Sequence, residues 1–129
     1  AYYQPQWQGL VHRGSLPFIY RNKIIMTASN NSFYTSGNTR YVFIDGLLCD
    51  SMDKVYATLQ SQLSIPDYFG NNLDALEEVL ADLEWVEEKK IKLVVINVAA
   101  LVANDSTRKG ELLSILENND SKRLQVELV

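Results

Sequence analysis

The sequence predicts an α/β fold in which a small sheet of three parallel strands carries helices packed on it. Three apolar segments have the length and the branched composition of strands, and segments with the apolar period of helices lie between them. Helical connections favour parallel strands with right-handed crossovers, because they return the chain to the same end of the sheet. A chain of 129 residues can bury its own core, so we expect one domain at 41–129 and an N-terminal extension at 1–40.

The extension contains Arg and Lys but no Asp or Glu, whereas the remainder of the chain is acidic. Its aromatic and branched side chains are too frequent for a disordered segment. Residues 19–27 are predicted to form a strand, and the Asn, Ser and Gly residues at 30–32 and 36–38 are typical of turns. We therefore expect the extension to contain a strand or a hairpin that packs on the main domain.

The first strand of the main domain is predicted at residues 41–45, where a short apolar run ends at Gly46. Ser51 is placed to cap the helix that follows, because its hydroxyl can accept a hydrogen bond from a free backbone N–H. The buried face of this helix is predicted from residues at helical spacing, namely Met52, Val55, Tyr56, Leu59 and Leu63.

The second strand is predicted at residues 93–98, a continuously apolar run that is typical of a central strand covered on both faces. A further helix is expected to begin at 105–107 and to end at 118–120. The alternation of apolar residues at 124–129 predicts a partly exposed closing strand. The apolar positions of the helix are Leu112, Leu113, Ile115 and Leu116.

The stretch at residues 64–87 is expected to form a turn followed by a helix. Pro66 and Gly70 mark the turn, and Asn71 or Asn72 is placed to cap the helix. Apolar residues at spacings of three, four and seven then form one stripe that must face a core. These residues are Leu73, Leu76, Val79, Leu80 and Leu83.

The opposite face of this helix carries four carboxylates, at Asp74, Glu77, Glu78 and Asp82. No Lys or Arg occurs from residue 65 to residue 88, so this face has no local countercharge. Like charges four residues apart, as at Asp74 and Glu78, disfavour a helix by roughly 0.2–0.5 kcal/mol. Such a face suits a basic partner. Taken alone, the charges are also explained by an ordinary solvated face, in which Asp74 is favoured by the helix dipole.

Residues 65–76, IPDYFGNNLDAL, resemble the barstar family, the intracellular inhibitors of barnase-type ribonucleases. The family pattern is a Pro, an acidic residue, two aromatics, Gly, a variable residue and then Asn-Leu-Asp-Ala-Leu, and every fixed position is met. The Trp-Val-Glu at 85–87 is similar to one in the family if this helix is about two residues longer. The resemblance extends more weakly over 41–129 and leaves the first 40 residues unexplained. It implies the same fold, a three-stranded parallel sheet with helices packed on it.

The resemblance implies a tight one-to-one complex with a basic ribonuclease, or with a toxin nuclease domain to which this protein confers immunity. Carboxylates on a rigid helix would occupy the sites where Arg, Lys and His of the nuclease bind phosphates. Asp74 and Glu78 would meet those cations. The other contacts implied by position are Tyr68, Gly70, Asn72, Leu73, Glu77, Trp85 and Glu87.

Two departures from the family pattern bear on the target. Glu78 stands where the family has Asp, which adds one methylene group and more rotamer freedom. Glu77 stands where the family has Trp, which replaces an aromatic anchor with a charge. The expected target is therefore a diverged nuclease and not barnase itself. The family's other acidic contact comes from the segment before the last helix, where Asp105 is a candidate.

Composition excludes several classes of function. The net charge of −4 and the pI of about 4.9 argue against a nucleic-acid binder. Cys49 has no second cysteine to pair with and is expected to be semi-buried, and His12 has no catalytic neighbour. The sequence shows no pattern of a transmembrane segment or a signal peptide, which favours a cytoplasmic protein without membrane contact. We expect no cofactor or metal, and a monomer when the protein is free.

Two other hypotheses remain open. The chain can be a generic interaction domain whose acidic face binds a different basic partner. It can also be an enzyme, because Asp74 and Glu78 are suited in principle to acid–base or metal chemistry. No His, Cys or Lys of the helix completes such a site, and the chain lacks a phosphate-binding glycine loop and a nucleophile elbow. We therefore predict that the protein is not an enzyme.

Overall fold

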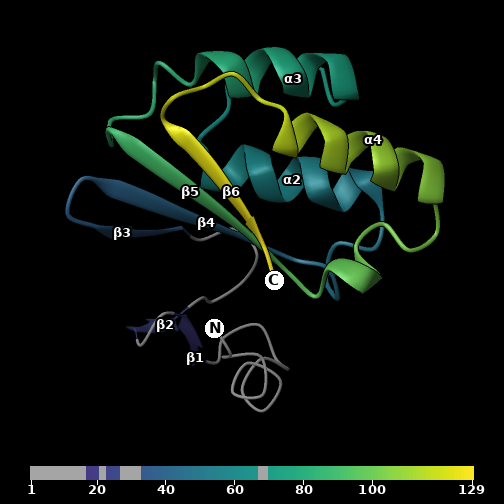
Figure 1. Cartoon of the computed structure of the whole chain (residues 1–129), viewed down its shortest axis with the longest axis horizontal. Helices are drawn as coiled ribbons and strands as arrows, with labels where there is room; N and C mark the ends of the chain where they lie inside the picture. Colours follow the sequence, from purple (N-terminus) through teal and green to yellow (C-terminus); the bar gives the residue numbers. More distant parts are fainter. Residues whose placement is uncertain (1–16, 21–22, 27–32, 67–69) are drawn as a thin grey trace.

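The computed structural model describes residues 17–20, 23–26, 33–66 and 70–129 of the chain (Figure 1). Strands β1 (Pro17–Tyr20) and β2 (Lys23–Met26) form an antiparallel pair within the N-terminal extension. The expected turn at 30–32 and His12 lie outside the described residues. The remaining elements are β3 (Tyr34–Ser36), β4 (Thr39–Asp45), α2 (Met52–Gln62), α3 (Leu73–Asp82), β5 (Lys90–Ile96), the short 3-10 helix η1 (Val98–Ala100), α4 (Ser106–Glu117) and β6 (Leu124–Leu128).

The main sheet has the strand order β3-β4-β5-β6 and is mixed. Strands β4, β5 and β6 are parallel, as the sequence predicts, whereas β3 is antiparallel to β4. The prediction of a three-stranded parallel sheet is therefore wrong by one strand, which comes from the region before residue 41. Gly37 makes this strand possible, because its φ of +60° allows a two-residue turn that brings Ser36 opposite Thr39.

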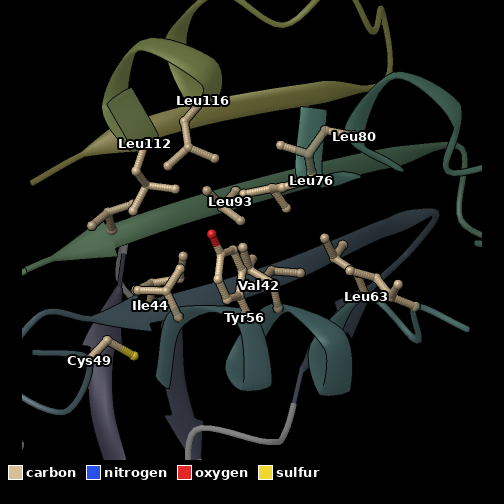
Figure 2. Close-up of a cluster of buried hydrophobic side chains, with 14 of the residues drawn as sticks. Val42, Ile44, Cys49, Tyr56, Leu63, Leu76, Leu80, Leu93, Leu112 and Leu116 are labelled. Atoms are coloured by element: carbon tan, nitrogen blue, oxygen red, sulfur yellow. The ribbon is translucent and has the colours of Figure 1, made fainter. Parts of the chain in front are cut away.

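Helices α2, α3 and α4 cover the same face of this sheet. The parallel strands follow one another in sheet order, so both crossovers advance in one direction, and right-handed crossovers then place their helices on one side. Buried residues of all three helices accordingly share one cluster with Val42, Ile44 and Leu93 of the strands. Figure 2 shows the labelled leucines of α3 and α4 gathered with Tyr56 of α2 around these strand residues.

Residues 93–96 of the central strand β5 are buried on both faces, which confirms the prediction from the apolar run, although β5 ends at Ile96 and Val98 belongs to η1. Leu93 and Val95 belong to the cluster beneath the helices. Val94 and Ile96 point to the opposite face of the sheet and are 0% and 3% exposed.

Helices α2 and α4 begin at capping residues, at the positions that the sequence predicts. Ser51 Oγ accepts a hydrogen bond from the N–H of Lys54 at 3.4 Å, and Asp105 Oδ1 accepts one from Arg108 at 3.1 Å. All five residues predicted for the buried face of α2 are buried. No helix among the described residues has the length and apolar character needed to cross a membrane.

The side chain of Gln62, the last residue of α2, takes the place of a neighbouring strand along part of β4. Its amide oxygen accepts a hydrogen bond from the N–H of Phe43 at 2.9 Å, and its amide nitrogen donates to the carbonyl of Phe43 at 2.8 Å. Gln62 is 1% exposed, and these two hydrogen bonds satisfy both the oxygen and the nitrogen of its buried amide. These bonds fix the carboxyl end of α2 on the sheet, just before the chain turns toward α3.

The loops that follow β4 and β5 are joined to each other by backbone contacts. The N–H of Gly46 donates to the carbonyl of Ile96 at 2.8 Å, and the N–H of Val102 donates to that of Cys49 at 3.0 Å. A side chain cannot be placed at Gly46, because a Cβ atom there would lie 2.0 Å from the carbonyl oxygen of Asn97. At the carboxyl ends of β4 and β5, the backbones of the two loops are consequently packed directly against each other.

Candidate functional site

Helix α3 begins at Leu73, and Asn72 is its N-cap, one of the two residues that the sequence proposes. The Oδ1 atom of Asn72 accepts a hydrogen bond from the N–H of Ala75 at 2.8 Å, and its Nδ2 atom donates to the carbonyl of Gly70 at 3.2 Å. Asn71 has a φ of +50°, a left-handed conformation that Asn adopts more readily than most residues. The turn at 70–72 therefore sets where α3 starts.

The apolar stripe holds α3 on the core as predicted. Leu76, Leu80 and Leu83 are fully buried, and Leu73 and Val79 are half-buried against the same cluster. Each fully buried leucine side chain stabilises the fold by about 1.5–3 kcal/mol, so the stripe fixes the rotation of α3 about its axis. The side chains of the opposite face consequently project into solvent.

We define the acidic surface as the exposed carboxylates of α3 and of the loop that follows it, namely Asp74, Glu77, Glu78, Asp82, Glu84 and Glu87. Within the part of the chain that the structure describes, none of them lies within 4.0 Å of a Lys or Arg nitrogen. The helix dipole favours a carboxylate only in the first turn, so those near the end of α3 disfavour the helix. The acidic surface is therefore a concentrated negative charge without an ion-pair partner among the described residues.

Helix α3 is shorter than the stretch at 64–87 suggests. It stops at Asp82, and Leu83 takes a left-handed φ of +47° while its N–H still donates to the carbonyl of Val79 at 3.1 Å. Trp85 and Glu87 therefore lie in a loop at residues 83–89 and not on the helix.

Trp85 connects this loop to the chain that precedes α3. The indole ring is half-buried, and its N–H donates a hydrogen bond to the carbonyl of Leu63 at 2.9 Å. The polar atom of Trp85 is thus engaged within the protein. Only the exposed part of its ring is available for the partner contact that the sequence proposes.

Arg40 makes a second connection between the segments on either side of α3. Its Nε atom donates to Glu88 Oε1 at 2.8 Å, and its Nη1 atom donates to the carbonyl of Gln62 at 3.0 Å and to Ser64 Oγ at 3.3 Å. The guanidinium also lies 3.8 Å from the centre of the Phe33 ring, a favourable cation–π distance. One cation, 7% exposed, therefore ties β4 to both ends of the α3 segment.

The predicted site residues have different surroundings, although most lie on α3 or directly beside it. Asp74, Glu77 and Glu78 are exposed on the helix, where their carboxylates are accessible to a partner. Gly70 is part of the cap, because its carbonyl accepts a hydrogen bond from the Nδ2 atom of Asn72. A Cβ atom at Gly70 would lie 3.0 Å from that nitrogen. The aromatic residue expected at position 68 lies outside the described residues.

The exposed carboxylates of this site are chemically suited to contact with cationic groups. Carboxylates accept charge-assisted hydrogen bonds from guanidinium and ammonium groups. The described residues contain no cluster of three or more His, Cys, Asp or Glu side chains placed to hold a metal ion. Asp105, the other acidic candidate, uses its Oδ1 atom to cap α4, and its presence in an interface stays a prediction.

Cys49 is unsuited to nucleophilic chemistry. It is fully buried, which is more than the sequence suggests, and its Sγ atom lies 3.4 Å from Thr58 Oγ1. Burial raises the pKa of the thiol, so the reactive thiolate is disfavoured at neutral pH.

Sequence reasoning missed Glu84 and Arg40. Glu84 belongs to the same run without Lys or Arg that identifies its neighbours, so that run was a sufficient signal. Arg40 carries no local signal, because its hydrogen-bond partners are 22 to 48 residues away along the chain.

Comparison with known families identifies the family of the main domain. A family model described as Barstar (barnase inhibitor) matches residues 39–127 of the chain. This match confirms the resemblance seen at 65–76. It begins with β4, includes α3 and the loop after it, and leaves out β1, β2 and β3. A search of curated proteins finds no match.

Proposed function

The chain belongs to the barstar family, and from this premise we propose that it inhibits a basic ribonuclease by covering the phosphate-binding cleft with its acidic surface. The single observation that carries the proposal is the row of exposed carboxylates on α3, which have no ion-pair partner among the described residues. These carboxylates would take the positions of RNA phosphates and exclude the substrate from the cleft.

Asp74 and Glu78 are the residues we expect at the centre of the contact. They are one helical turn apart, which puts their Cβ atoms about 5–6 Å from each other. The buried stripe holds the backbone of both on a fixed helix, so little backbone entropy is lost when they bind. Arg and Lys side chains of the nuclease can then form short hydrogen bonds with both carboxylates.

The neighbours of this pair favour a target that differs from barnase. Glu77 is exposed beside Glu78 and adds a third carboxylate where the family pattern has Trp. A nuclease with an additional Arg or Lys opposite Glu77 would pair with it, whereas a nuclease with an apolar pocket there would leave a buried, unpaired charge. Selectivity for the target would therefore depend on Glu77.

We also propose the biological setting that the family suggests. The protein would act as the immunity protein of a secreted toxin nuclease and would protect the cytoplasm of the producing cell. It would be a monomer before it binds its partner, and it would require neither a cofactor nor nucleic acid.

The proposal is tested by titrating the purified protein into RNA-cleavage assays with a panel of secreted barnase-class ribonucleases and toxin nuclease domains from the same source. We expect stoichiometric inhibition of at least one nuclease and a one-to-one complex in size-exclusion chromatography. The control is the double variant Asp74→Asn, Glu78→Gln, which keeps the side-chain shapes and removes two charges. It should remain folded by circular dichroism and lose inhibition.

Two results would contradict the proposal. Equal inhibition by the double variant would place the contact on another surface. If the parent inhibits no nuclease, and affinity capture from the source recovers only basic proteins without nuclease activity, the generic interaction domain becomes the better description.

A further inference from the structure

Arg123, the residue before β6, binds the backbone of the loop at 83–89. Its Nη1 atom donates to the carbonyl of Leu83 at 2.7 Å. Its Nη2 atom donates to the carbonyl of Val86 at 2.7 Å and also to that of Glu88. Its Nε atom makes a longer contact, 3.4 Å, to the carbonyl of Lys89. One guanidinium therefore binds carbonyl groups along the whole loop.

These carbonyls belong to the C-cap of α3 and to the loop that follows it. The carbonyl of Leu83 also accepts a hydrogen bond from the N–H of Val86 at 3.1 Å, whereas the carbonyls of Val86, Glu88 and Lys89 lie beyond the end of the helix. A cation near the carboxyl end of a helix is favoured by the helix dipole. Leu83 leaves the helix in a left-handed conformation, and the loop then brings carbonyls of four residues within reach of one side chain. The planar guanidinium presents five N–H groups in a fixed arrangement and can satisfy several of these carbonyls together.

Arg123 holds this loop without forming an ion pair with the acidic surface. Its donors are directed at backbone carbonyls, and within the described residues it forms no ion pair with Glu84 or Glu87. Both carboxylates stay exposed. The charge of Arg123 therefore stabilises the shape of the loop, while the charges of the loop remain available to a partner.

We propose that Arg123 is a positioning residue that makes the loop at 83–89 a fixed part of the acidic surface. It holds Glu84 and Glu87 in a constant position relative to the carboxylates of α3, so that a basic partner meets one preorganised surface. Preorganisation of this kind lowers the entropy lost on binding and slows dissociation. The inference rests on the proposed function for its binding consequence, but its structural part can be measured on the free protein.

Arg123→Lys is the informative substitution. It keeps a positive charge next to the loop, but an ammonium group lacks the planar fork that reaches several carbonyls. Lys122→Ala is the matched control, because Lys122 is an exposed cation one residue away and makes no side-chain hydrogen bond or ion pair with described residues. A change caused only by net charge would appear in Lys122→Ala and not in Arg123→Lys.

The first measurement is hydrogen exchange of the free proteins. In Arg123→Lys we expect the amide of Val86, which donates a hydrogen bond to the carbonyl of Leu83 at 3.1 Å, to exchange about tenfold faster, because the loop opens locally. The amides of residues 93–95 in β5 should keep the parent rate, and Lys122→Ala should match the parent throughout. Unchanged exchange at Val86 in Arg123→Lys would overturn the proposal, whatever the partner.

The second measurement is binding to the nuclease that the parent inhibits. Dissociation of Arg123→Lys should be about tenfold faster than that of the parent, and that of Lys122→Ala should change less than twofold. Glu87→Ala should weaken binding less in the Arg123→Lys background than in the parent. A merely structural residue would lower the urea midpoint and leave the effect of Glu87→Ala the same in both backgrounds.

The outcomes separate the two proposals. If the parent binds a nuclease but Arg123→Lys binds it with parental kinetics, the positioning role is wrong and the proposed function stands. If no nuclease binds the parent, the proposed function fails and so does the binding role of Arg123. The exchange measurement then still decides whether Arg123 holds the loop.

Discussion

Charged and polar side chains have opposite surroundings in two regions of this molecule. The carboxylates of the acidic surface are exposed and have no ion pair among the described residues. Beneath them, Arg40 and Gln62 are 7% and 1% exposed and are hydrogen bonded to Glu88, Ser64 and the backbone. A buried polar group stabilises the fold only when it is satisfied, whereas an exposed charge costs the fold little and remains free for a partner. Substitutions in the two regions should therefore affect different properties.

Of these substitutions, Arg40→Ala should have the largest effect, which is a loss of stability. It leaves the Glu88 carboxylate and the Gln62 carbonyl without their donor, so the free energy of unfolding should fall by about 3 kcal/mol in urea denaturation. The control Arg108→Ala removes an exposed arginine on α4 and should change stability by less than about 0.5 kcal/mol. Similar midpoints for both variants would mean that the buried arginine gives no more net stability than an exposed one.

Asp74→Ala and Glu78→Ala should each weaken binding to the target by more than about 2 kcal/mol, measured by calorimetry or surface plasmon resonance. Part of this loss is the cost of a partner cation left unpaired. Stability should change by less than about 0.5 kcal/mol, and Glu78→Ala can raise it by relieving repulsion from Asp74. Glu117→Ala, which removes an exposed carboxylate on α4, is the charge-matched control. Parental affinity for both variants would make the acidic surface an ordinary solvated face.

A change in salt concentration should affect the functions of the two regions differently, without any substitution. Between about 10 and 150 mM salt the screening length falls from roughly 30 Å to 8 Å, so association with a basic partner should slow about tenfold in stopped-flow experiments. The free energy of unfolding should change little over the same range, because the pair of Arg40 and Glu88 is largely shielded from solvent. An association rate independent of salt would remove electrostatic steering from the mechanism.

Asn72→Ala should give the smallest of these effects, at the boundary between the regions. It removes the acceptor that caps α3 and should lower the free energy of unfolding by about 1 kcal/mol. Asn72→Asp keeps an acceptor at the cap and should preserve stability. A loss of the same size in both variants would show that the Nδ2 contact to Gly70, and not the cap, is the important one.

The sequence was most informative where local chemistry decides the structure. Side chains that accept from free N–H groups located the starts of α2, α3 and α4, and the apolar periods located the buried faces of α2 and α3. Strand β3 was not predicted, although the dipeptide Gly37-Asn38 is typical of a two-residue hairpin turn. With only three residues, β3 is too short to show an alternation of its own.

The end of α3 and the support of the acidic surface were not predictable from local patterns. Leu83 has no residue-level preference for a left-handed conformation, and its carbonyl is bound by Arg123, 40 residues away. Trp85 likewise bonds to Leu63, 22 residues earlier in the chain. Contacts of this kind depend on the completed fold. The carboxylates and the apolar stripe behind them could be identified from the sequence, but not the long-range contacts that hold the loop after α3.

The strand order has a consequence for the kind of ligand this fold suits. Open α/β sheets commonly bind small molecules in the crevice where the direction of the crossovers reverses. Here the parallel strands β4, β5 and β6 are added in one direction, so the described sheet has no such reversal, and the loops near its carboxyl ends are joined by main chain. Helix α3 instead lies at the periphery of the molecule, away from the strand ends where such crevices form, and its charged residues are exposed (Figure 1). An exposed helix of this kind is suited to contact with the surface of another protein, and such a contact would need no pocket in the sheet.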